Sequence, residues 1–322
     1  MKPLIVVGPV CFAIMRPVGQ PLCVSGFRVA AIAGSRLLDS LEGECDLHPV
    51  DEHASREWLQ AVRPDLVLIE SDGLRSERDS SGWGHEEAGE LLEACRESGI
   101  PSGVWVSEGD GAGMPRSTLL RRADRVFAPD TVSADLLADQ VPRRPIVVPH
   151  AASRSALRGS LPDGAGAAYV DGYDGRPPDG SEAYVDSLFE AAGPLGMRIL
   201  ASRDSDRAAE LLRECGALPY FGPAESLPRA VFDALGAGLH VVAPGNHVAL
   251  RVVPGLVAHS SAAAKVGVEL RSAMGATDEE LSRRASRRAV IAHAHTYPHR
   301  LATIASAFGF ALLPDGEARR PD

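Results

Sequence analysis

The sequence predicts an α/β protein with two doubly wound, Rossmann-like domains that face each other across a cleft. The first observation is the length of 322 residues, which exceeds one ordinary domain of about 100–200 residues. The second is an alternation of short runs rich in Val and Ile with stretches of helical periodicity, which is typical of a parallel sheet covered on both faces. The third is a break in this alternation at residues 153–166, whose Gly, Ser and Pro content indicates a linker.

The first predicted domain covers residues 1–152. We expect strands at residues 4–7, 27–32, 64–70, 100–106, 125–128 and 145–148, and helices at residues 56–62, 86–98 and 131–140. The run at 4–7 is too short for the apolar region of a secretory signal peptide, and Gly8 and Pro9 close it. It is therefore expected to be a first strand, in a protein that stays in the cytoplasm.

The alternation restarts in the second predicted domain, at residues 167–276. Strands are expected at 167–170, 197–201, 218–221, 240–243 and 256–259, and helices at 181–192, 206–215, 227–235 and 262–274. Cys95 in the first domain and Cys215 in the second each come shortly before a glycine. Both are expected on the buried face of a helix near its end.

Residues 277–313 are expected to form helices that cross back to the first domain, because they follow a complete second domain. Thr277 and Glu280 have the spacing of a capping box, and the helix that they begin should run to about His295. Pro298 interrupts the helical pattern before a last helix. The Arg pairs of the long helix are expected to face solvent, and the polar residues 314–322 to form a disordered tail.

Composition excludes several classes of protein. The net charge of −10 argues against a surface for nucleic acid or anionic membrane, and no run of about 18 apolar residues predicts a membrane span. The five cysteines form no C-x-x-C pair, so neither a disulfide framework nor a zinc site is expected. Lys2 and Lys265 are the only lysines, so a phosphate group would have to bind to Arg or to a helix N-terminus.

Candidate site residues follow the predicted strands, because open parallel sheets bind ligands beyond the carboxyl ends of their strands. In the first half, this rule selects Glu70, Glu108, Asp110, Asp130 and His150, and in the second half it selects Arg176 and Arg203. No G-x-G-x-x-G after a strand, no P-loop and no G-x-S-x-G elbow is present. His293 and His295 are two apart and point in different directions on a helix, so no metal site is expected there.

The most informative segment is residues 222–244. A Gly-Pro turn leads to Glu225, and a helix is expected to begin at Pro228, where its backbone N–H groups and dipole create an anion site. Asp233 lies eight positions after Glu225, so a loop carboxylate and a helix carboxylate can approach one ligand from two sides. The small residues 236–238 allow the helix to pack closely on the next strand.

This segment resembles the Glu-x7-Glu region of retaining glycosyltransferases with the GT-B fold, in particular glycosyltransferase family four and the spore-maturation-type, CgeB-like enzymes. The resemblance is carried by Glu225, Ser226, Leu227, Pro228, Asp233, Ala234, the Gly-Ala-Gly at 236–238, Val241 and Val242, and by the His-Thr-Tyr-x-x-Arg pattern that ends at Arg300. It covers about residues 165–309, and the first 150 residues share only the architecture.

The resemblance implies roles for individual residues. Glu225 would hold the donor sugar with Ser226 and Leu227 beside it, and Asp233 would hold the ribose, with a reach shorter by one methylene than the family's Glu. Arg176 resembles the arginine of the family's diphosphate clamp. The clamp lysine is missing: either Arg203 or Arg229 replaces it, or the donor is held more weakly. The catalytic set would be Glu225, Arg176 and Asp110, and the acceptor would lie near Glu108, Asp110 and His150.

The expected function is transfer of a sugar from a nucleoside-diphosphate sugar to a small-molecule, glycan or peptide acceptor, with retention and without metal or cofactor. A homodimer is left open. One alternative is a GT-B-type sugar-nucleotide epimerase with an acid/base among Asp110, Asp130 and His150. Another is a catalytically degenerate partner subunit, which the missing lysine and the short Gly8-Pro9-Val10 loop would suit.

Overall fold

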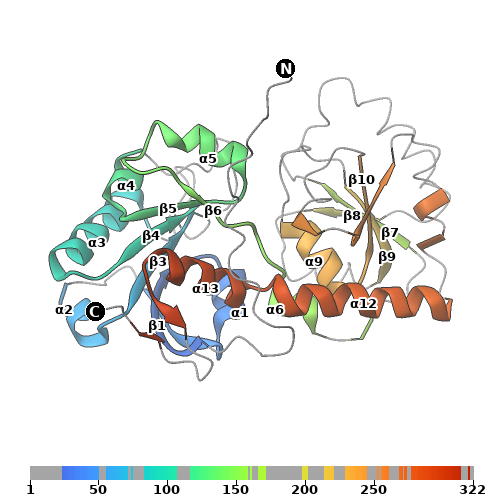
Figure 1. The fold of residues 1–322 in the computed structure, drawn as a ribbon, viewed down its shortest axis with the longest axis horizontal. Coiled ribbons are helices and arrows are strands. Elements are labelled where there is room, and N and C mark those ends of the chain that lie inside the picture. The colour runs from blue at the N-terminus through green and yellow to red at the C-terminus, as the bar shows by residue number, and fades with distance from the viewer. Residues whose placement is uncertain are drawn as a thin grey trace, which may run out of the picture.

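The computed structural model contains two α/β units that lie side by side (Figure 1). The structure describes residues 24–50, 56–71, 74, 83–106, 117–158, 160–161, 166–171, 198–201, 214–220, 229–244, 252–253, 255–260, 268–270, 272–273, 277–312 and 318–319. The predicted strand at 4–7 and the predicted helix at 181–192 lie outside these residues.

The first unit is built on a six-stranded sheet in the order β2-β1-β3-β4-β5-β6, in which every neighbouring pair is parallel. Its strands are β1 (Val24–Ile32), β2 (Cys45–Pro49), β3 (Leu66–Glu70), β4 (Ser102–Trp105), β5 (Arg125–Ala128) and β6 (Ile146–Val147). Its helices are α1 (Ser35–Leu41), α2 (Arg56–Val62), α3 (His85–Ser98), α4 (Ser117–Arg122) and α5 (Thr131–Ala138).

The second unit is built on a five-stranded sheet in the order β11-β10-β9-β7-β8, again with parallel neighbours. Its strands are β7 (Gly166–Asp171), β8 (Arg198–Ala201), β9 (Cys215–Pro219), β10 (His240–Pro244) and β11 (Val257–Ser260), and α9 (Arg229–Ala237) connects β9 to β10. The predicted fold class, α/β with two parallel sheets, is confirmed.

The structure differs from the predicted elements where the apolar pattern is weak. Strand β2 was not predicted, because its sequence Cys-Asp-Leu-His-Pro has no apolar run and only its first residue is buried. Helix α1 was also missed. The placement of Cys215 on a helix is wrong, because Cys215 is the first residue of strand β9, whereas Cys95 lies buried on α3 ahead of the left-handed Gly99, as predicted.

The start of the predicted linker is an ordered helical turn. Residues Arg154–Leu157 form α6, and the Ser153 hydroxyl caps it by accepting a 3.2 Å hydrogen bond from the Ala156 backbone N–H. The Ser153 backbone N–H donates to the Asp233 carboxylate of α9. The first residues of the linker are therefore held against the second unit by specific polar contacts.

The C-terminal helices divide between the two units. Helix α12 (Asp278–Ala294) runs along the second unit, where Ile291 joins the core around α9 (Figure 1). The break between the two helices lies at His295 and Thr296, and Pro298 stands in the first turn of α13 (Tyr297–Ala307). Helix α13 contributes Tyr297, Leu301 and Ile304 to a core of the first unit. Within the tail that the sequence predicts to be disordered, β13 (Ala318–Arg319) pairs with β12 (Ala311–Leu312).

The chain passes twice between the units, and its two passages lie against each other. Ala152, on the way out of the first unit, forms a parallel bridge with Thr296, on the way back. Its backbone N–H donates a 2.9 Å hydrogen bond to the carbonyl of His295. The two passages thus form one narrow double connection.

Candidate functional site between the two units

Helix α9 carries two buried charges where the second unit meets the first. Arg229 and Asp233 are four residues apart, on one face of the helix, and their exposed fractions are 5% and 1%. All residues of α9 are buried, which explains why its pattern is apolar or small apart from these two. A charge is rarely buried without a partner, so each must have a specific counter-charge.

The partner of Arg229 is Glu70, the last residue of β3 in the first unit. The Arg229 guanidinium lies 2.5 Å from Glu70 Oε1, and Glu70 Oε2 accepts a 3.1 Å hydrogen bond from the backbone N–H of Gly34, just ahead of α1. Arg229 Nε also donates to His150 Nδ1 at 3.4 Å. This contact assigns the ring proton of a neutral His150 to Nε2.

The partners of Asp233 come from the exit of the first unit and from α1. Asp233 Oδ1 accepts a 2.7 Å hydrogen bond from the Ser153 backbone N–H, and Oδ2 lies 3.1 Å from the Arg36 guanidinium. Both carboxylate oxygens are therefore engaged. Arg36 lies in the first turn of α1, just beyond the carboxyl end of β1.

His150 is fixed from several sides. Its ring stacks on Trp105 with 6.2 Å between centroids, and its side chain contacts Arg229. Trp105 Nε1 donates a hydrogen bond to the carbonyl of Val148, which lies two residues before His150. Arg300 Nε donates to the carbonyl of His150 itself. His150 is 3% exposed, so its ring lies inside the contact between the units.

Arg300 of α13 holds the double connection together. In addition to the His150 carbonyl, it contacts His295 Nδ1 at 3.1 Å and lies over the ring of Phe232 in α9, 5.6 Å from the centroid. Burial lowers the pKa of Arg300 to about 10, and burial with the nearby Arg300 charge lowers the pKa of His295 to about 4. His295 is therefore neutral at pH 7 and can accept a hydrogen bond from Arg300.

The hydroxyl of Tyr297 lies close to this group of charges. Burial raises the pKa of Tyr297, and the charges of Arg229, Glu70 and Asp233 also act on it. Among the residues that the structure describes, the hydroxyl has no hydrogen-bond partner. A buried hydroxyl without a partner is uncommon, and this one belongs to the His-Thr-Tyr-x-x-Arg pattern.

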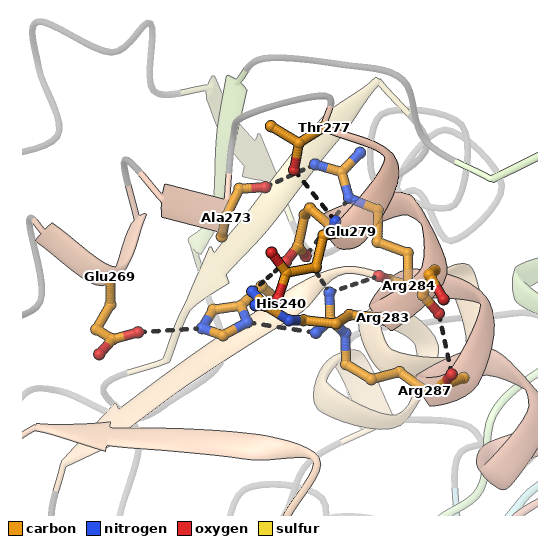
Figure 2. Close-up of polar contacts among 12 residues, drawn as sticks. His240, Glu269, Ala273, Thr277, Glu279, Arg283, Arg284 and Arg287 are labelled. Atoms are coloured by element: carbon orange, nitrogen blue, oxygen red, sulfur yellow. Dashed lines mark hydrogen bonds and ion pairs between the residues drawn. The ribbon is translucent and has the colours of Figure 1, made fainter.

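A second polar cluster lies at the opposite end of the second sheet (Figure 2). It joins α12 to His240, the first residue of β10. Glu280 accepts from Arg287, Arg287 Nη1 contacts His240 Nδ1 at 3.5 Å, and Arg284 donates to the Ala273 carbonyl at 2.6 Å. Burial, followed by the Arg287 charge, lowers the pKa of His240 to about 4. Because ligands bind at carboxyl ends of parallel strands, this cluster at an amino end is structural.

The cluster corrects the prediction that the Arg pairs of α12 face solvent. Arg284 is fully buried and Arg287 is 7% exposed, whereas Arg283 is exposed. One half of the predicted capping box is present: the Glu280 backbone N–H donates a hydrogen bond to the Thr277 hydroxyl. The Glu280 carboxylate instead turns inward to the arginines.

The structure brings together four of the residues selected from the sequence, Glu70, His150, Arg229 and Asp233. Seven others lie outside the described residues, and their roles stay predictions: Glu108, Asp110, Arg176, Arg203, Glu225, Ser226 and Leu227. Asp130 accepts a 2.7 Å hydrogen bond from the Ser133 backbone N–H and caps α5. Sequence analysis missed Arg36 and Ser153. The position of Arg36 just after β1 could have signalled it, had α1 been recognised.

None of the described helices is long and apolar enough to cross a membrane. No group of three or more His, Cys, Asp or Glu side chains within the described ranges is arranged to hold a metal ion.

No protein-family model and no curated protein matches this sequence. The solved structures that match are GT-B glycosyltransferases, as the resemblance in residues 165–309 led us to expect. TarM aligns with 79% of this chain at 7% identity and a TM-score of 0.47, and the match spans 57% of TarM. HepE of Anabaena, crystallised in complex with UDP and glucose, aligns over 87% of this chain and 91% of its own, at 13% identity and a TM-score of 0.49.

AviGT4, a glycosyltransferase involved in avilamycin A biosynthesis, aligns over 83% of this chain and 95% of its own, with 12% identity and a TM-score of 0.42. The TM-scores of these three matches all lie below 0.5.

Proposed function

We propose that this protein is a glycosyltransferase that takes its sugar from a nucleoside-diphosphate sugar. The observation that carries the proposal is the position of α9. Its Arg229 and Asp233 meet residues at the carboxyl ends of three strands of the first sheet, namely Arg36 after β1, Glu70 at the end of β3 and His150 after β6. Carboxyl ends are where parallel sheets bind ligands, and α9 lies in the segment that resembles the family's donor site.

The charges suit a diphosphate leaving group. Cleavage of the bond between sugar and phosphate leaves negative charge on the diphosphate, which arginines and a helix N-terminus stabilise in a site shielded from water. Arg229 is the first described residue of α9, so it adds its charge to the positive end of the helix dipole. In a chain without lysine between Lys2 and Lys265, Arg176 and Arg229 take the role of the clamp.

The finer parts of the proposal rest on the family resemblance. Glu225 holds hydroxyl groups of the donor sugar, Asp233 holds the ribose, and the acceptor binds on the first unit near Glu108 and Asp110. The sugar is transferred with retention, and no metal ion takes part, because arginines and the helix N-terminus neutralise the leaving group.

The first experiment is a thermal-shift screen of the full chain with UDP, GDP, ADP, dTDP and their sugars. A ligand at 100 times its dissociation constant stabilises the folded state by about 2.7 kcal/mol, which is easily measured. The absence of any shift across this panel would contradict the proposal. Incubation of the binding nucleotide sugar without acceptor then separates the alternatives. An epimerase changes the sugar, whereas a degenerate subunit binds the nucleotide and changes nothing.

The second experiment is the substitution Glu225→Gln, which keeps the shape and removes the charge. A charge-assisted hydrogen bond to the sugar contributes about 1.5–3 kcal/mol, so the transfer rate should fall about 10- to 150-fold. The nucleoside diphosphate alone should bind almost as it does to the unmodified protein. Glu90→Gln, an exposed change on α3, is the matched control. A folded Glu225→Gln protein with undiminished transfer would remove Glu225 from the site.

A further inference from the structure

Helix α9 meets the first unit through two ion pairs, and α9 supplies the positive charge to one pair and the negative charge to the other. Arg229, the positive residue of α9, faces Glu70, and Asp233, one turn later, faces Arg36. We call these two pairs the α9 latch. The first unit presents a negative charge to Arg229 and a positive charge to Asp233. Both pairs therefore form together in only one relative position of the two units.

The latch is shielded from water, so its contacts are specific. The side chains of Glu70 and Arg229 are 1% and 6% exposed, and those of Asp233 and Arg36 are 2% and 17% exposed. Surface ion pairs contribute little, but removal of one partner from a buried pair leaves a charge without compensation. The two units are therefore held together by contacts that cannot be lost one at a time without cost.

The latch also occupies the groups that the proposed donor needs. Both Asp233 oxygens are engaged, one by the Ser153 N–H and one by Arg36, and the side chain has almost no exposed surface. A ribose hydroxyl cannot reach Asp233 in this arrangement. A diphosphate oxygen is an acceptor of the same charge as the Glu70 carboxylate, so the two are alternative partners for the Arg229 guanidinium.

We propose that the α9 latch gates the donor site: the two ion pairs hold α9 against the first unit, and they open when a nucleoside diphosphate takes Arg229 from Glu70. This inference rests on the proposed function. When the latch opens, the Arg229 guanidinium exchanges the Glu70 carboxylate for a diphosphate oxygen, so it keeps an anionic partner. Glu70 and Arg36 lose their partners on α9 in the same step.

The double connection supplies the axis for this opening. Ala152 and Thr296 are bridged, and Arg300 binds the His150 carbonyl on one passage and the His295 ring on the other. These contacts use none of the four latch side chains, so loss of the two ion pairs leaves them in place. Since the two passages meet at one place, the second unit can turn about them as about a hinge.

The test replaces latch residues of the first unit only, so that Arg229 and Asp233 stay available for the ligand. Glu70→Gln and Arg36→Met each break one pair, and Arg36→Met also leaves the hydrogen bond between Ser153 and Asp233 in place. The probe is whichever of UDP, GDP, ADP and dTDP gives the largest thermal shift with the unmodified protein. If the latch competes with the ligand, both variants should bind it 5- to 150-fold more tightly in titration calorimetry.

The matched control is Asp135→Asn, which breaks the exposed ion pair between Asp135 and Arg144 inside the first unit, 2.7 Å long. It should leave the affinity for the nucleoside diphosphate unchanged. Small-angle scattering without ligand gives a second readout, in which Glu70→Gln and Arg36→Met should show a larger radius of gyration than the control. The double variant Glu70→Gln/Arg229→Gln should regain part of the stability that either single change loses, which keeps the latch testable if a single variant folds poorly.

The outcomes separate the latch from the proposed function. If no nucleoside diphosphate binds to the unmodified protein or to either variant, the proposed function fails, and gating fails with it. If the unmodified protein binds the probe and the two variants bind it equally or more weakly, the gating is overturned while the proposed function stands. Tighter binding together with a larger radius of gyration supports both.

Discussion

At the scale of single residues, the buried charges of α9 combine two tasks that are usually separate. Asp233 is assigned to the ribose by resemblance, yet its contacts fasten α9 to Ser153 and Arg36 of the outgoing chain and of α1. A side chain with both tasks cannot be changed without effects on stability and on binding. Measurements on its variants therefore have to record both quantities.

We expect Asp233→Asn to lower the free energy of unfolding by about 1–3 kcal/mol, because the amide presents either an N–H to Arg36 or an N–H to the Ser153 donor. It should also weaken binding of the nucleoside diphosphate. Urea unfolding and calorimetry measure the two effects, and Asp39→Asn, an exposed change on α1, is the control. An Asp233→Asn protein as stable as the control would contradict the contacts described here.

Three half-buried histidines give the protein a defined sensitivity to acid. The pKa values of His240, His295 and His299 are each lowered to about 4, from the ordinary 6.5, mainly by burial. The unfolded chain therefore binds more protons than the folded chain between pH 6.5 and pH 4. Stability should fall as the pH drops through this window, by an amount of the order of 3 kcal/mol per histidine, and then level off.

The measurement is the free energy of unfolding at several pH values from 7 to 4. His295→Gln should flatten this dependence, whereas His293→Gln, an exposed change in the last turn of α12, should not. Equal slopes for the two variants would show that His295 does not stay neutral in the folded protein.

At the scale of elements, α12 is attached to the second sheet by a carboxylate that serves two buried arginines. Glu280 is 3% exposed and contacts Arg284 and Arg287. Among the described contacts of Arg287, the Glu280 carboxylate is the only negative charge, and Glu280→Gln removes it. We expect a loss of about 3–5 kcal/mol in the free energy of unfolding of the second unit, measured in urea.

Glu279→Gln is the natural comparison, because Glu279 pairs with Arg283 on the exposed side of the same helix. Its replacement should cost less than about 1 kcal/mol. Similar losses for Glu279→Gln and Glu280→Gln would mean that the inward side of α12 is solvated.

The elements also show what could be predicted from the sequence and what could not. Strand β3 reads Leu-Val-Leu-Ile-Glu and is buried throughout, so its apolar run was sufficient to predict it. Strand β2 has one buried residue, and edge strands of this kind carry no apolar run to recognise. The inward arginines of α12 were mispredicted because a charged residue indicates solvent unless its partner is known. The partners Ala273 and Gly238 lie outside the helix, 11 positions from Arg284 and 49 positions from Arg287.

The candidate site was predictable to a similar degree. The position of Glu70 and His150 at strand ends followed from the rule for parallel sheets, and Arg229 and Asp233 were selected through the resemblance of residues 222–244. The pairing of Arg229 with Glu70 and of Asp233 with Arg36 could not be predicted, since it depends on how two separately folded units meet.

At the scale of the whole molecule, the proposed chemistry relies on arginines and a helix N-terminus. The rate of sugar transfer should therefore be the same, within about twofold, before and after treatment with EDTA and in the presence of added Mg²⁺ or Mn²⁺. Initial rates with the identified donor measure this. A loss of more than about tenfold on chelation that Mg²⁺ or Mn²⁺ restores would contradict metal independence.

The double connection at Ala152 and Thr296 has a consequence for the order of the chain. Because the chain leaves the first unit and returns to it at adjacent points, with the Ala152 N–H bonded to the His295 carbonyl at 2.9 Å, the second unit is inserted between β6 and α13 of the first. A segment that replaced it would need ends that lie equally close together, and charges that match Glu70 and Arg36.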